Sequence, residues 1–102
     1  MADLPVTLTV SAPDREPITV RCDSVRLIVS DSRDGRTVGG SVGIRRGHIP
    51  ALMALAPGKV RAYLDGREIF SCETSGGLAS VGGDRVAIMT DRFDGPEQTE
   101  QP

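Results

Sequence analysis

Glycine and proline recur throughout this sequence and limit the length of any regular element. The chain contains 12 glycines and 7 prolines among 102 residues. Proline lacks an amide hydrogen and fixes its own φ, whereas glycine permits the backbone geometry of tight turns. Their frequency predicts many turns, and it favours short strands over long helices.

Short segments of alternating apolar and polar residues lie between the predicted turns. Residues 6–10 give the clearest case, because Val6, Leu8 and Val10 would share one face of a strand. In residues 25–29, Ile28 would face away from its apolar neighbours and need cover of its own. We expect further strands at 18–22, 59–64 (with Val60, Ala62 and Leu64 inward), 67–73, 78–81 and 86–90.

Residues 51–56 have helix-forming side chains, but Pro50 and Pro57 bracket them. We therefore expect a short strand or an extended arm there. Asp65 and Gly66 predict a hairpin, because a type I′ turn needs positive φ at both central residues. Residues 11–17 read as a turn, and residues 31–40 as a long exposed loop. That loop is either functional or a tolerated insertion.

The expected architecture is all-β: a flattened β-sandwich or barrel of about ten short strands in two sheets, with no C-terminal helical domain. Residues 1–94 would form this single domain, and residues 95–102 a polar, disordered tail. Aromatic residues make up only 3% of the chain, so the core must be aliphatic.

Charge and cysteine content exclude several classes of function. A net charge of −2 argues against binding to nucleic acid or to anionic lipid. The sequence begins without a signal peptide and has no apolar run long enough to span a membrane, so we expect a cytosolic protein without direct membrane insertion. Cys22 and Cys72 are expected to be reduced core residues, and neither a disulfide nor a metal site is favoured.

One histidine, His48, lies in an unusual segment rich in glycine and proline, residues 43–52. No acid or cysteine lies near it in sequence, so no catalytic triad is evident. Residues 39–43 superficially resemble a phosphate-binding loop, but they lack the Lys-Ser/Thr that would follow. We therefore expect no catalytic residues and no cofactor, and we interpret His48 as a structural residue on these grounds alone.

Several motifs in order resemble the epsilon subunit of F-type ATP synthases, specifically its N-terminal β-sandwich domain. The resemblance runs from about Leu8 to Asp91, most of the chain. Each motif is weak alone, but all of them in order are specific. They are Val10-Ser11-Ala12-Pro13, Gly43-Ile44-x-x-Gly47-His48-x-Pro50-x-Leu52, Leu55-x-Pro57-Gly58-x-Val60-Arg61, Ser75-Gly76-Gly77 and Val86-x-Ile88-Met89-Thr90-Asp91.

The resemblance implies a non-catalytic rotor subunit of the central stalk, in a proton- or sodium-translocating enzyme. Such a subunit binds the gamma subunit and rests on the ring of c subunits, at the cytoplasmic face of the plasma membrane. Ser11, His48 and Met53 match positions that the family places toward gamma. Ser41 and the preceding loop, with Arg33 and Arg36, match the part that faces the c-ring.

The sequence departs from the family pattern in three ways. Ser41 stands where an acidic residue is usual, the loop 31–40 is longer, and the C-terminal helical hairpin is missing. Arg33 and Arg36 could replace the lost polar contact to the ring. An alternative is a free-standing recognition module resembling forkhead-associated phosphopeptide binders. Gly35-Arg36, Ser41 and His48 follow the order of that family, but their spacing fits poorly.

Overall fold

A computed structural model describes residues 5–30 and 38–95 of the chain. This part of the chain forms ten strands and no helix, so the short-strand prediction is confirmed. The strands are β1 (Val6–Ala12), β2 (Arg15–Cys22), β3 (Ser24–Ser30), β4 (Val38–Arg45), β5 (His48–Leu55), β6 (Gly58–Leu64), β7 (Arg67–Thr74), β8 (Gly77–Gly83), β9 (Arg85–Met89) and β10 (Phe93–Asp94).

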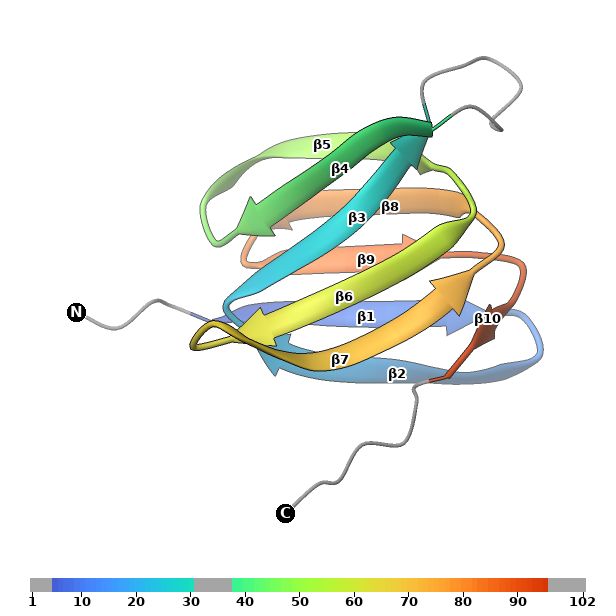
Figure 1. The fold of residues 1–102 in the computed structure, drawn as a ribbon, viewed down its shortest axis with the longest axis horizontal. Coiled ribbons are helices and arrows are strands. Elements are labelled where there is room, and N and C mark those ends of the chain that lie inside the picture. The colour runs from blue at the N-terminus through green and yellow to red at the C-terminus, as the bar shows by residue number, and fades with distance from the viewer. Residues whose placement is uncertain (1–4, 31–37, 96–102) are drawn as a thin grey trace.

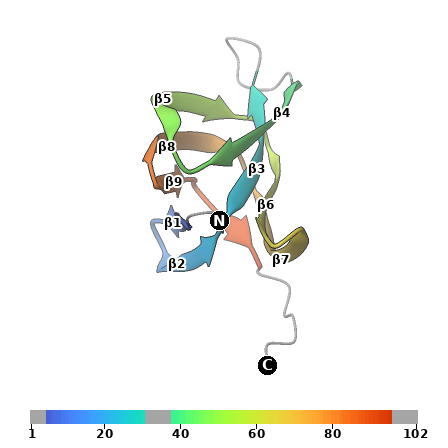
Figure 2. The ribbon, with the colours of Figure 1, turned by 90° about the vertical axis from the view of Figure 1, so that its left-hand side faces the viewer.

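The strands form two layers that face each other. The front layer in Figure 1 has the order β4-β3-β6-β7-β10, and the rear layer has the order β5-β8-β9-β1-β2. Figure 2 shows the two layers from the side. They belong to one hydrogen-bonded sheet, because β5 leads into β6 and its last residue, Leu55, pairs with Val29 of β3. The predicted flattened sandwich is therefore confirmed, with its two layers continuous at this corner.

The core lies between the layers and is built from the inward residues of the alternating segments. Leu8, Leu27, Ile44 and Ile88 are the largest side chains that are completely buried. Burying each such side chain stabilises the fold by about 1.5–3 kcal/mol. The core is aliphatic as expected, apart from Phe70 and Phe93.

The sandwich corner explains two sequence features. Ile28, which faces away from the core side of β3, lies against Gly58 at the start of β6. A Cβ atom at Gly58 would come within 2.9 Å of Cδ1 of Ile28, so the glycine makes room for this side chain. The cover that Ile28 was expected to need is thus supplied by the turn that joins the layers.

The Asp65-Gly66 hairpin is confirmed. Asp65 has φ 54° and Gly66 has φ 79°, as the two central residues of a type I′ turn require. Leu64, however, was wrongly expected to face inward. It is the last residue before this turn, and 42% of it remains exposed.

Two predicted irregular segments are shorter than expected. The turn placed at residues 11–17 is confined to Pro13 and Asp14, because β1 reaches Ala12 and β2 already begins at Arg15. Pro17 lies within β2, which is tolerated because β2 is an edge strand. Residues 38–40 of the predicted loop belong to β4, where Val38 and Gly40 pair with β3 across a register shift. Residues 31–37 and the predicted tail beyond Gly95 lie outside the described residues.

Both cysteines are free and buried, as expected. Burial raises the pKa of each thiol from 9.0 to about 11. The folded state thus disfavours the thiolate. Ionisation of the thiols should therefore leave the free energy of unfolding unchanged below pH 9. It should lower the free energy of unfolding as the pH rises from 9 to 11.

Unfolding curves across this pH range will test the thiol contribution. A variant with both Cys22→Ala and Cys72→Ala should lack the thiol part of the decline. An equal decline in this variant would assign the effect to other groups.

Candidate functional site

The outer side of the rear layer carries an unusual set of neighbouring residues. The strand registers place them in rows across β1, β9, β8 and β5. In the first row, Ser11 pairs with Met89, Met89 with Leu78, and Leu78 with Ala54. In the second row, Thr9 pairs with Ala87, Ala87 with Ser80, and Ser80 with Leu52. We call these eight residues the apolar face.

The apolar face has no charged member. In the next row, Thr7 of β1 pairs with a charged residue, Arg85 of β9. Depletion of charge together with exposed aliphatic and methionine side chains distinguishes the centres of protein interfaces from ordinary surface.

Exposure confirms that large apolar groups of this face meet solvent. Leu52 is 68% exposed, Met89 45% and Leu78 43%. These are three of the four large, exposed hydrophobic residues in the described part of the chain; Leu64 is the fourth. Their gathering across three adjacent strands makes the apolar face a candidate docking surface.

The residues predicted to face gamma have different positions relative to the apolar face. Ser11 belongs to it, is partly buried, and donates its hydroxyl hydrogen to the carbonyl oxygen of Ile88 at 3.4 Å. Met53 is half-buried and packs against the core, while its neighbour Leu52 is the exposed side chain. The backbone of His48 pairs with Gly83 at the start of β5. The side chain of His48 lies outside what the structure describes.

Of the residues predicted to face the c-ring, only Ser41 falls in a described segment. It is exposed on β4, at the outer side of the front layer, and Nη1 of Arg26 donates a hydrogen bond to its hydroxyl at 3.3 Å. Arg33 and Arg36 lie outside the described residues. Ser41 therefore lies apart from the apolar face, which belongs to the opposite layer (Figure 2).

Two features escaped the sequence reasoning. Leu78 and Met89 were assigned to strands but not recognised as neighbours, because the sequence does not show the register in which β8 and β9 pair.

Arg15 was assigned to a turn. Its guanidinium donates to the carbonyl oxygens of Phe93 at 2.8 Å and Gly95 at 3.0 Å, and it lies 4.0 Å from the centre of the Phe93 ring. Arg15 thereby joins β2 of the rear layer to β10 of the front layer.

No group of three or more His, Cys, Asp and Glu residues within 5–30 and 38–95 is arranged to hold a metal ion. No buried side-chain nitrogen or oxygen in this part lacks a hydrogen-bond partner. No helix long and apolar enough to cross a membrane occurs among these residues either.

Comparisons with known proteins found a matching family and several relatives. Residues 6–95 match the family model of the ATP synthase Delta/Epsilon chain, beta-sandwich domain. An ATP synthase epsilon chain from Frankia casuarinae is 34% identical over 89 residues, covering 86% of this chain and 94% of that protein. One from Anaeromyxobacter sp. strain K is 29% identical and covers 84% of this chain. The chain matches only 58% of the Anaeromyxobacter protein.

A solved structure shares the fold. It is a chain of the Euglena gracilis mitochondrial ATP synthase, studied by cryo-electron microscopy as an OSCP/F1/c-ring assembly. The TM-score is 0.70 at 24% identity, over 92% of this chain and 55% of that one.

Proposed function

Because the chain belongs to the ATP synthase delta/epsilon family and forms the β-sandwich domain of that family, we propose that it is a non-catalytic subunit of the central stalk of an F-type ATP synthase. It links the gamma subunit to the c-ring and couples proton or sodium-ion flow to ATP synthesis and hydrolysis. It works as a peripheral subunit at the cytoplasmic side of the plasma membrane.

The observation that supports this proposal is the uncharged, apolar face of β5, β8, β9 and β1. Leu52, Leu78 and Met89 expose large apolar side chains there. Covering them with a partner would remove apolar surface from water, which stabilises a complex by about 25 cal/mol per Å² of buried surface before the costs of association. We propose that gamma covers this face, with Ser11 at one corner, and that gamma also contacts His48 and Met53, which lie on β5 beside its members Leu52 and Ala54.

The fold suits a mechanical role. Hydrogen bonds run through one continuous sheet from β10 to β2, and the core between its layers is closely packed. Packed interiors have low compressibility and transmit strain. A torque applied by gamma at the rear layer would therefore reach the opposite side of the domain with little deformation.

Titration against purified gamma subunit tests this function. We expect saturable binding, and we expect His48→Ala to weaken it by about tenfold while the thermal unfolding midpoint stays unchanged. Binding that is absent, or unaffected by His48→Ala, would contradict the proposed gamma contact. A phosphothreonine peptide added in place of gamma should not bind, and tight binding of that peptide would favour a recognition module.

We also propose that Arg33, Arg36 and Ser41 contact the c-ring. Deleting residues 33–37 removes both arginines and stops before β4, which begins at Val38. We expect the deletion variant to fold and to bind gamma normally, but to lose most of its attachment to the ring in a pull-down with detergent-solubilised c-ring. Full retention on the ring would refute this contact.

A further inference from the structure

The front layer ends in β4, whose outer edge has no partner in the described part of the chain. Among the described strands, β4 pairs only with β3. It is eight residues long, and its other edge presents backbone N–H and C=O groups to no described strand. Such an edge is a template for an added strand from another chain.

The other edge strands carry features that discourage addition along their length, whereas in β4 the one such feature, a register shift at residues 38–40, lies at the start of the strand and leaves residues 40–45 in regular register with β3. β2 contains Pro17, β5 contains Pro50, and β10 has only two residues. Proline cannot donate to a ladder, and a very short strand offers few groups. β4 has neither proline nor lysine along its eight residues.

The side chains beside this edge define what would bind there. Gly43 and Arg45 are exposed on the outer side of β4, while Ile44 between them is buried in the core. A strand added next to β4 would place alternate side chains on the same two sides. The outward residues of the added strand would lie beside Gly43 and Arg45. Its inward residue would lie beside Ile44, at the edge of the apolar core.

Gly43 opens a path to a second arginine. The register pairs Gly43 with Arg26 of β3, and Nη2 of Arg26 lies 3.7 Å from the place where a Cβ atom of residue 43 would stand. Nη1 of Arg26 is held by Ser41 of β4. The Arg26 guanidinium thus lies over the edge strand itself, and a long side chain opposite Gly43 can reach it.

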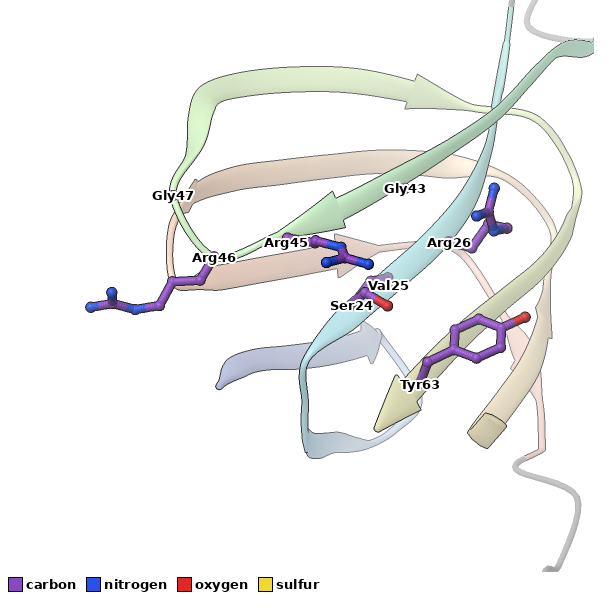
Figure 3. A pocket seen from close by; sticks show the side chains of 8 residues that line it. All are labelled: Ser24, Val25, Arg26, Gly43, Arg45, Arg46, Gly47 and Tyr63. Atoms are coloured by element: carbon purple, nitrogen blue, oxygen red, sulfur yellow. The ribbon is translucent and has the colours of Figure 1, made fainter. Parts of the chain in front are cut away.

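These arginines line a hollow on the outer side of the front layer. It has a volume of about 350 Å³ and is bordered by Ser24, Arg26, Gly43, Arg45 and Tyr63, among others. Figure 3 shows Arg45 directed over β3 and Arg46 directed away from the hollow. Neither Arg26 nor Arg45 forms an ion pair with a described carboxylate. Asp23 and Asp65 line a neighbouring hollow that Arg26 and Arg45 also border, but neither of these carboxylates forms an ion pair with the two arginines.

We propose that the free edge of β4 binds an extended segment of a partner protein in which acidic and apolar residues alternate. One carboxylate pairs with Arg45, and a second extends across Gly43 to Arg26. The apolar residue between the two acidic residues covers the edge of the core at Ile44. Backbone hydrogen bonds supply the attachment, and the two charge-assisted contacts select the acidic sequence. This surface is separate from the apolar face proposed for gamma.

A short synthetic peptide in which glutamate and valine alternate tests the proposal. We expect it to bind in isothermal titration calorimetry at low salt and to slow hydrogen exchange of alternate β4 amides between residues 40 and 45. The double variant Arg26→Gln, Arg45→Gln should weaken binding by about tenfold. Arg21→Gln, on the edge strand β2, is the matched control and should leave binding unchanged.

Three results would overturn the proposal. They are equal affinity for a peptide with glutamine in place of glutamate, protection of β2 or β5 amides in place of β4 amides, and unchanged affinity of the double variant. Two N-methylated peptides refine the test. Methylation of the peptide amides that face β4 should abolish binding, whereas methylation of the amides on the opposite edge of the peptide should leave binding unchanged. The Leu78→Asp variant should bind the peptide normally, so failure at this edge is distinguishable from failure of the gamma contact.

Discussion

Replacing Gly77 by alanine is expected to lower the free energy of unfolding by about 3 kcal/mol or more. Gly77 opens β8 with φ +135°, a conformation that residues with a side chain rarely adopt. A Cβ atom there would collide with the carbonyl oxygen of Met89 and lie 3.0 Å from Cα of Thr90. Both obstacles are backbone atoms of the neighbouring chain segment, so relief requires β8 and β9 to separate.

Urea unfolding followed by circular dichroism will measure this loss. Gly82→Ala is the matched control, because Gly82 lies in the same strand and a Cβ atom added there would have no neighbouring atom within 4 Å. We expect Gly82→Ala to change stability by less than about 0.5 kcal/mol. Equal stability of the Gly77→Ala and Gly82→Ala proteins would show that the β8–β9 junction is looser than the structure indicates.

Leu78→Asp is expected to weaken gamma binding by about 100-fold or more. Leu78 lies between Ala54 and Met89 in the first row of the apolar face. A partner that covers this row would have to bury the new carboxylate without an opposite charge among the eight residues of the face, and an unpaired buried charge is costly. Because Leu78 is 43% exposed in the free protein, the substitution should cost little stability.

The chain offers a closely matched control for this experiment. Leu64 has nearly the same exposure, 42%, and lies on β6 of the opposite layer. Leu64→Asp introduces the same charge on a similarly exposed leucine and should leave gamma affinity unchanged. Surface plasmon resonance with immobilised gamma will compare the two variants. A similar loss in both would mean that net charge, and not the apolar face, controls binding.

Much of the fold could be predicted because the signals are local. Alternation along residues 6–10 identifies Val6, Leu8 and Val10 as core residues, and all three are buried. The Asp65-Gly66 turn follows from the backbone conformations that this dipeptide tolerates. The start of β2 was missed because Pro17 normally argues against a strand, and only the tertiary structure shows that β2 is an edge.

The candidate docking surfaces were harder to predict, because they depend on pairing between distant segments. Leu52, Leu78 and Met89 become neighbours only through the registers of β5, β8 and β9. Alternation alone cannot decide which of Leu52 and Met53 faces solvent in the apolar run 51–56, and the pairing of Leu52 with exposed Ser80 decides it. The gamma and c-ring roles of individual residues came from family resemblance and stay predictions.

Arg15 has a consequence for how the domain bears load at its last described strand. As a strand, β10 forms two pairs with the front layer, Phe93 with Thr74 and Asp94 with Glu73, and hydrogen bonds between Ser75 and Arg92 adjoin them. All of these hydrogen bonds join the segment to β7 and its end, so on their own they would pass tension applied at Gly95 to the front layer. The two hydrogen bonds from Arg15 anchor the same segment to β2, so a pulling force divides between both layers. A force on the β10 segment is therefore opposed by hydrogen bonds to both layers at once. This makes the segment a mechanically strong attachment point of the domain.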